Sequence, residues 1–398
     1  TNGNIFKRTD NRWGGVVWYM NEVGERKRKS FSGTTKAEVN KKITKYISKF
    51  NKEISENNES NKSLKSSMYN YLKVFKYPSV ERVSYDRLEQ LLNNEIVPYI
   101  GDKIISNITA VDIKTLINTL TEKGYAFSTV KKTYNLLNEY FRYLEQEEIL
   151  FKNPMRSVGV IKKANFYANQ GKEVLPASET ITIFTPEEIE KFKKECFKTW
   201  GTGKPFYQQS AAYILMLNTG LRTAEMLGLH NSDIDLENKV MRIQRGVKEV
   251  GKRVGTEKQP GREIAVGKLK TASSRRVVPL NSTAIEMIKK LREEFYFGED
   301  SPLVCDGNGN YTKPSNFRKR FYRILESAKI EKKGLHSLRH TFATNLVNGI
   351  KQPDGTIKSL TPRQVADLLG HSTSDITEMY YVKRNDDLLN GITNGFEI

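Results

Sequence analysis

Four short motifs in the second half of this sequence hold side chains of types that do chemistry on charged oxygen groups. An arginine guanidinium matches the oxygens of a carboxylate or a phosphate with parallel hydrogen bonds. Histidine and lysine can carry protons, and a tyrosine oxygen becomes a nucleophile once it loses its proton. The candidate side chains are those of Arg222, Lys270, His336, Arg339, His371 and one of the two adjacent tyrosines, Tyr380 or Tyr381.

Arg222 stands in the stretch LNTGLRTAEMLGL, residues 217–229. We expect Gly220 to end one helix and Arg222 to lie in the turn before the next. Glu225 follows three residues later, within reach of the guanidinium. An arginine among apolar residues is costly unless it is paired. The pattern therefore fits an internal Arg–Glu pair, or a carboxylate that orients Arg222 for function.

His336 and Arg339 are three residues apart in GLHSLRHTFATNLVNG, residues 334–349, and share one face of a predicted helix. His336 and His340 also have the spacing of metal ligands on a helix. Ser337 stands where an HExxH motif needs glutamate, so we discount a metal site.

Lys270 begins the stretch KTASSRRVVPL, between two predicted strands. A lysine at such a hairpin tip is usually only solvated. Further on, a helix is predicted to end at Gly370, with His371 just beyond it. Tyr380 and Tyr381 follow nine and ten residues after that histidine. A pair of tyrosines on its own indicates packing.

Taken in order, the four motifs resemble those of the tyrosine recombinase (phage integrase) family. The family pattern runs TG-x-R-x-x-E, then K-T-x-x-S-x-R-x-V-P-L, then H-x-L-R-H-T-F-A-T, then L-G-H followed by tyrosine. The matching residues are Thr219, Gly220, Arg222, Glu225, Lys270, Thr271, Ser274, Arg276, Val278 to Leu280, His336, Leu338 to Thr344, and Leu369 to His371. The resemblance covers nearly the whole chain, including a small N-terminal segment like that of integrases from phages and integrative elements.

The resemblance implies an enzyme that cuts and rejoins DNA through a 3′-phosphotyrosyl bond, with no cofactor and no metal. Arg222 and Arg339 would stabilise the charge on the scissile phosphate. His336 and His371 would add hydrogen-bond donors and help to manage the proton of the tyrosine. Lys270 would protonate the leaving 5′-oxygen.

The family nucleophile lies nine or ten residues after the histidine of the LGH motif. Members with nine-residue spacing often carry an apolar residue just before the tyrosine, and Met379 is that residue here. We therefore choose Tyr380 over Tyr381.

The implied partner is double-stranded DNA with core and arm attachment sites. Arg276, Lys131 and Lys132 are further residues that we expect to contact it. The enzyme would integrate and excise a mobile element as a homo-tetramer that exchanges its C-terminal tail, with an accessory DNA-bending protein as a further possible partner. Two other functions stay open: a type IB-like DNA-relaxing enzyme, and a catalytically silent DNA-binding regulator.

The elements that position these residues fall into a multidomain chain. Residues 1–55 predict a small α+β domain of three strands and a helix, similar to an arm-site-binding domain, with cations and aromatics on its sheet. Those residues are Arg12, Trp18, Lys27, Arg28 and Lys29. A solvated strand edge with ordinary core tryptophans is the plain alternative. Residues 56–66 are polar and are expected to be a linker.

Residues 67–160 predict an all-α bundle similar to a core-site-binding domain, with helices that begin at Thr109 and Ser128. A second linker is expected over 161–182. Residues 183–398 predict a mainly α catalytic domain with a small β-sheet, which opens with a capping box at Thr185. Its hairpin before Lys270 has a long loop over 250–262.

Composition agrees with a DNA partner. The chain has 65 Lys+Arg against 46 Asp+Glu, a net charge of +19, which favours a polyanion. No apolar run could span a bilayer. Together with the resemblance, this implies a cytoplasmic bacterial protein that is nucleoid-associated when bound to DNA. The two cysteines, Cys196 and Cys305, form no CxxC motif and are expected to be reduced.

Overall fold

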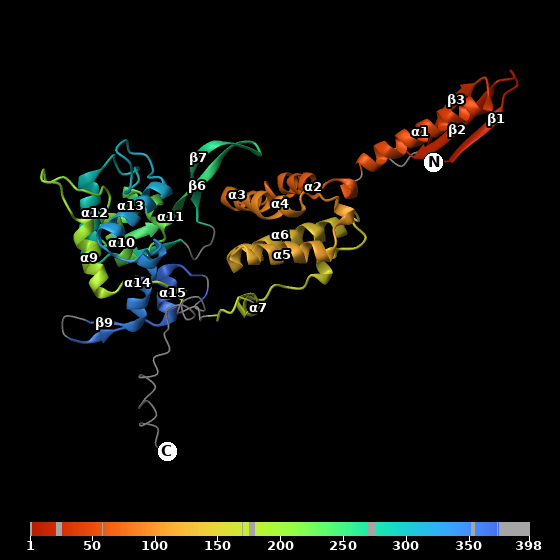
Figure 1. Ribbon diagram of the computed structural model, residues 1–398. Helices are drawn as coiled ribbons and strands as arrows, with labels where there is room; N and C mark the ends of the chain where they lie inside the picture. Colours follow the sequence, from red (N-terminus) through yellow and green to blue (C-terminus); the bar gives the residue numbers. More distant parts are fainter. Residues whose placement is uncertain are drawn as a thin grey trace, which may run out of the picture. The chain divides into compact units, whose positions relative to one another are not determined.

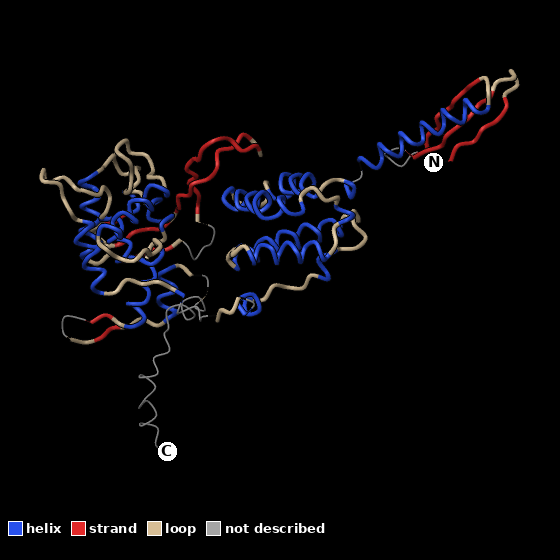
Figure 2. Tube along the Cα trace, in the orientation of Figure 1, coloured by secondary structure: helices blue, strands red, loops and turns tan. Residues whose placement is uncertain are grey.

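The structure is a computed structural model (Figure 1) that describes residues 2–20, 26–57, 59–168, 170–174, 180–269, 275–351, 355–371 and 373. The chain divides into two compact units, Thr1–Lys172 and Glu173–Ile398. Figure 2 colours their helices and strands. Within the described ranges, no helix is long and apolar enough to cross a membrane.

The chain begins with a three-stranded antiparallel sheet and a helix, as the sequence predicts. The elements are β1 (Asn2–Lys7), β2 (Trp13–Met20), β3 (Arg26–Gly33) and α1 (Lys36–Asn57), and the strand order is β1-β2-β3. Val39 and Ile43 of the helix are buried with Val17 of the sheet. A Cβ on Gly15 would come within 2.5 Å of Ile43. The glycine therefore lets helix and sheet approach closely.

The next part is an all-helical bundle, also as predicted. Its main elements are α2 (Leu64–Tyr71), η2 (Leu72–Lys76), α3 (Arg82–Leu91), η3 (Leu92–Ile96), α4 (Val97–Ile100), α5 (Ala110–Glu122) and α6 (Phe127–Gln146). α5 begins after Thr109 as predicted, and Thr109 forms a capping box with Asp112. α6 begins at Phe127, one residue before the start predicted at Ser128, and Ala126 is its N-cap.

Short elements lie before, within and after this series of helices. They are η1 (Glu59–Asn61), η4 (Ile105–Asn107), η5 (Pro154–Ser157) and α7 (Lys163–Ala168). Leu64 belongs to the bundle core, and so does Phe166, whose ring lies 5.3 Å from that of Phe127. The helical core thus reaches a few residues into both segments that the sequence predicts as linkers.

The second unit is mainly helical with small antiparallel sheets. Its helices are α9 (Pro186–Cys196), α10 (Ala211–Thr219), α11 (Thr223–Gly228), η6 (Asn231–Asp233), α12 (Ser282–Glu294), α13 (Pro314–Ser327), α14 (His336–Asn348) and α15 (Pro362–Leu369). One sheet has the order β4-β5-β8, from β4 (Ile234–Asp235), β5 (Val240–Ile243) and β8 (Arg276–Pro279). The remaining strands are β6 (Arg245–Val254), β7 (Glu257–Lys268), β9 (Ile350–Lys351) and β10 (Ile357–Lys358).

The segment 250–262, expected as a loop, is instead part of a paired hairpin. β6 and β7 stay antiparallel up to the pair Val254↔Glu257, with one irregularity near Gly251. A two-residue turn closes the hairpin, and its first residue, Gly255, has a φ of +58°. Such turns need a residue that tolerates positive φ, so the glycine allows the strands to continue.

Candidate active site

Arg222 is held at the start of a helix by a tight turn. α10 ends at Gly220, which has a left-handed φ of 64°, as predicted. A Cβ there would lie 2.5 Å from Phe342 and 2.6 Å from Leu369, so the position needs glycine for space as well as for conformation. Arg222 then takes the N-cap position of α11.

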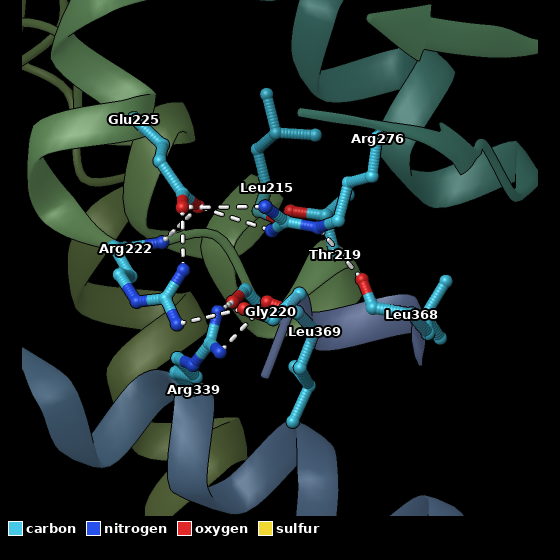
Figure 3. Close-up of polar contacts among 10 residues, drawn as sticks. Leu215, Thr219, Gly220, Arg222, Glu225, Arg276, Arg339, Leu368 and Leu369 are labelled. Carbon is cyan, nitrogen blue, oxygen red and sulfur yellow. Dashed lines mark hydrogen bonds and ion pairs between the residues drawn. The ribbon is translucent and has the colours of Figure 1, made fainter. Parts of the chain in front are cut away.

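The carboxylate of Glu225 is the centre of a polar network (Figure 3). It accepts hydrogen bonds from the backbone N–H of Arg222 at 2.9 Å and from Arg222 Nη1 at 2.7 Å. Arg276 donates to the same carboxylate from Nη1 at 3.2 Å and from Nη2 at 3.0 Å. The orienting contact expected between Arg222 and Glu225 is thus present, and a second guanidinium shares it.

Glu225 is an anion in this environment. Burial alone would raise the pKa of its carboxyl group. The hydrogen bond and charge of Arg276, with the charge of Arg222, instead hold that pKa below its ordinary value. The buried charge of Glu225 is therefore balanced by two cations.

Arg339 is fully buried on α14, with 0% of its surface exposed. Its Nη1 donates to the carbonyl of Gly220 at 2.7 Å, and its Nη2 donates to that of Leu369 at 2.8 Å. His336 lies on the same helix, and its ring centroid is 4.7 Å from that of His340. The predicted helix thus carries His336 and Arg339 into the same polar region.

His371 follows the C-terminal end of α15. This helix begins with a capping box at Thr361 and ends, as predicted, at Gly370, whose φ is +68°. The backbone N–H of His371 donates to Ala366 O at 2.9 Å, which closes the helix end. Arg222 Nη2 lies 3.3 Å from Gly370 O, directly beside this histidine in the chain.

The histidines of this region are held in the neutral form. Burial lowers the pKa of His371 to about 3, assisted by the charges of Arg339 and Arg222. Burial lowers the pKa of His336 to about 4, again with help from the two arginines. The positive charges of Arg222 and Arg339 act on both rings. The site therefore combines two arginines and two neutral imidazoles.

Two predicted residues cannot be placed. Lys270 and Tyr380, together with the alternative Tyr381, lie outside the described residues. The structure therefore brings together four of the six candidate residues, with Glu225 as their support.

Arg276 is turned inward. Its side chain is only 7% exposed, and besides Glu225 it binds the carbonyl of Leu368 from Nε at 2.8 Å. The direct DNA contact expected of Arg276 remains a prediction, and its contacts here are internal. This role is not visible in the sequence, because the partners of Arg276 stand 51 and 92 residues away.

The other expected DNA contacts lie on surfaces. Arg12 is exposed, and so are Lys27, Arg28 and Lys29 of β3, and Trp18 is 41% exposed. Arg26, which is not among the expected contacts, lies over the ring of Trp18 at 4.8 Å. In the helical bundle Lys132 is exposed, and Lys131 lies 5.0 Å from the ring of Tyr134. Among the described residues, no cluster of three possible metal ligands exists.

Comparisons with known proteins give this arrangement a family. The pattern of the "Phage integrase family" matches residues 183–387, slightly more than half of the chain. That of the "Phage integrase, N-terminal SAM-like domain" matches residues 63–121. These two ranges cover most of the second unit and the first part of the helical bundle.

Curated relatives agree with this result. "Tyrosine recombinase XerC-like" from Caldanaerobacter subterraneus subsp. tengcongensis is 29% identical over 90% of this chain and 89% of its own. "Transposase from transposon Tn916" from Enterococcus faecalis is 25% identical over 72% of this chain and 66% of its own.

Solved structures share the fold. A point variant of the Tn1549 transposon integrase, in complex with transposon right end DNA, aligns with a TM-score of 0.62. It is 20% identical, and the alignment covers 84% of this chain and 99% of that one. A lambda integrase dimer bound to a COC′ core site aligns with a TM-score of 0.59 over 96% of this chain and 95% of that one, at 15% identity. With the motifs, the buried arginine network and these matches in agreement, the chain belongs to the phage integrase family of tyrosine recombinases.

Proposed function

We propose that this protein is the integrase of a mobile element, which cuts and rejoins bacterial DNA at attachment sites through a 3′-phosphotyrosyl intermediate. The observation that supports this proposal most is one hydrogen-bonded frame of backbone carbonyls and Glu225, which holds Arg222 and Arg339 next to His371. Arg339 is fixed by Gly220 O and Leu369 O, and Arg222 by Glu225 and Gly370 O. A frame of this kind suits one phosphate and needs no reorganisation during the reaction.

The two arginines can stabilise the negative charge of the reacting phosphate. A phosphodiester repels nucleophiles, and its transition state spreads negative charge over the non-bridging oxygens. Each guanidinium has five N–H donors, so Arg222 and Arg339 can hold their carbonyl partners and also donate to phosphate. Arg222, with 34% of its side chain exposed, would be the outer contact.

Proton transfer falls to the remaining side chains. Tyr380 Oη would attack phosphorus as the P–O5′ bond breaks, which gives a phosphotyrosyl bond and a free 5′-hydroxyl. The neutral rings of His336 and His371 can accept the phenol proton or donate a hydrogen bond. Lys270 would give a proton to the leaving 5′-oxygen. Attack of a new 5′-hydroxyl reverses these steps and restores the DNA backbone.

The rest of the chain would select the DNA. The helical bundle, with Lys131 and Lys132, would bind the core sites, and the exposed strand β3 of the N-terminal sheet would bind arm sites. A net charge of +19 supports a polyanionic partner. Recombination of two duplexes calls for a tetramer, and we propose that it exchanges C-terminal tails and works with a DNA-bending protein where a site requires one. The setting would be the bacterial cytoplasm, with the enzyme on chromosomal DNA.

One experiment tests the proposal. The protein is incubated with a duplex attachment site that carries a nick next to the cleavage position, and SDS-stable protein–DNA adducts are resolved on a gel. We expect an adduct with the wild-type protein, no adduct with Tyr380→Phe, and unchanged DNA binding. Tyr381→Phe is the matched control and should still form the adduct.

Other outcomes identify the alternatives. An adduct lost only in Tyr381→Phe moves the nucleophile by one residue. Binding without any adduct indicates a catalytically silent regulator. Relaxation of supercoiled plasmid without strand exchange indicates a DNA-relaxing enzyme, for which a second DNA-binding domain has no evident use.

A further inference from the structure

Three successive carbonyls at the C-terminal end of α15 are each bound by a different arginine. Arg276 Nε binds Leu368 O at 2.8 Å, Arg339 Nη2 binds Leu369 O at 2.8 Å, and Arg222 Nη2 binds Gly370 O at 3.3 Å. The three arginines come from β8, α14 and the start of α11. We call this set of contacts the arginine clamp, and Figure 3 shows its three arginines together with Leu368 and Leu369.

The clamp fits the electrostatics of a helix end. The last carbonyls of a helix have no partners within the helix and carry partial negative charge. Positively charged guanidinium groups are therefore stabilised next to these carbonyls. The clamp fixes the direction in which α15 ends, and His371 is the next residue after the last clamped carbonyl, Gly370 O.

Arg276 is a largely buried member of the clamp. Its side chain is 7% exposed, whereas that of Arg222 is 34% exposed. It bridges Glu225, which in turn holds Arg222 by its backbone and its side chain. Arg276 therefore touches both supports of the site: the carboxylate that aims Arg222 and the helix end that precedes His371.

We propose that Arg276 is a positioning residue, which sets Arg222 through Glu225 and His371 through the end of α15 without contacting DNA. This inference rests on the proposed recombinase function and replaces the direct DNA contact expected from the sequence. Arg276 is also the first residue of β8, which follows Lys270 and residues 271–274 in the chain. Its hydrogen bonds therefore connect the start of this strand to Glu225 and to the end of α15.

The test compares three variants of the full-length protein. Arg276→Met removes the charge and the hydrogen bonds, and Arg276→Lys keeps the charge but cannot bridge both supports. Arg245→Met is the matched control, because Arg245 forms a similar pair with the buried Asp233 at 2.5 Å that is not part of the clamp. Adduct formation is measured in single turnover on the nicked site, DNA affinity by titration, and folding by thermal melting.

We expect Arg276→Met to cleave on the order of 100-fold more slowly, the cost of slightly misplaced catalytic groups, with unchanged DNA affinity. Arg276→Lys should recover only part of the rate. Arg245→Met should cleave at the wild-type rate once its folded fraction is taken into account. A loss of DNA affinity as the main effect of Arg276→Met would restore the direct contact, and equal rates in all proteins would end the proposal.

A second readout needs no DNA. The titration of His371 is followed by NMR of the nitrogen-15-labelled ring. The charge of Arg276 contributes to lowering the pKa of His371, so that pKa should rise in Arg276→Met and stay low in Arg276→Lys. An unchanged His371 titration in Arg276→Met would contradict the clamp, even if the wild-type protein formed no adduct and the proposed function failed.

Discussion

The chain holds two groups of cations that are built in opposite ways. On β3, residues 26–29 read Arg-Lys-Arg-Lys and are all exposed. Around Glu225, three arginines are bound to one carboxylate and four backbone carbonyls, and Arg339 is fully buried. The exposed group can attract a polyanion but cannot fix its position to a fraction of an ångström. The buried group has its geometry set before any ligand arrives.

This difference shows that the net charge of the protein and the charged groups of its catalytic site are separate properties. Exposed cations act through long-range attraction, which salt screens. Buried guanidiniums act through hydrogen-bond geometry, and salt reaches them poorly. Substitutions in the two groups should therefore differ in which measurement they change and by how much.

The largest effect is expected from Arg339→Ala. The carbonyls of Gly220 and Leu369 would lose their buried donor, and the phosphate would lose one of its two arginines. Single-turnover adduct formation should fall about 10³-fold, the upper range for one oxyanion donor. DNA affinity, measured at moderate salt, should fall far less. If the rate of adduct formation and the DNA affinity fell by the same factor, Arg339 would act mainly by binding DNA.

Glu225→Gln should come next, and should reduce both folding stability and rate. The variant leaves Arg222 and Arg276 near each other without an anion between them. Breaking a buried ion pair from one side costs about 3–5 kcal/mol of unfolding free energy, and a urea titration would measure it. Asp233→Asn removes the partner of Arg245 elsewhere in the same unit and should destabilise without slowing cleavage per folded molecule.

Gly220→Ala tests whether the turn, and not only its hydrogen bonds, is required. A left-handed φ costs a non-glycine residue about 1–2 kcal/mol, and here the new Cβ would also meet Phe342 at 2.5 Å. The matched control is Gly255→Ala in the hairpin turn, where φ is +58° and nothing lies within 4 Å. Thermal melting should show a clearly larger loss at Gly220. Equal losses would mean that Phe342 moves aside at no cost.

The pH dependence of stability separates the two units without any mutation. All four histidines lie in the second unit, and the pKa values of His336 and His340 are lowered to about 4 and that of His371 to about 3. A lowered pKa means that the unfolded chain binds protons more readily, so stability is full above about pH 6.5 and falls as the pH drops towards about 4.

Hydrogen exchange at about pH 7, 6 and 5, spanning the ordinary histidine pKa, would measure this effect peptide by peptide, after correction for the intrinsic exchange rate. Protection should fall over α10, α14 and α15 while that of α5 and α6, in a unit without histidine, changes less. Equal loss of protection in both units would show that carboxylates, and not the buried histidines, dominate the response.

Local features of this fold were predictable from the sequence, and contacts between distant segments were not. The capping boxes at Thr109, Thr185 and Thr361 depend on residues three positions away, and all three are present. The inward direction of Arg276 depends on Glu225 and Leu368, which are distant in sequence. From the sequence, a basic residue in a DNA-binding family is expected to bind DNA, because its pairing with a buried carboxylate appears only once the chain is folded.

The hairpin and the N-terminal sheet show the same limit. A polar stretch with glycines at 250–262 was expected to be a loop, yet cross-strand pairing extends through it. On the sheet, the sequence indicated cations and aromatics but not which face each occupies. The register pairs Trp18 with Arg28, and Val17 with Lys29. Since Val17 is buried beneath α1, Arg28 lies with Trp18 on the open face, and Lys29 lies on the face that α1 covers in part.

That register gives the smallest and most specific prediction. Arg28→Gln removes a cation from the open face beside Trp18, where a duplex could lie against the sheet. The affinity for an arm-site duplex should fall by about 1 kcal/mol, and the slope of log affinity against log salt should shrink by about 1. Lys29→Gln, one residue away on the other face, should change both quantities less. Equal effects of the two substitutions would mean that the exposed cations attract DNA by their number and not by their positions. They would then differ most clearly from the clamp, in which each arginine has a fixed position.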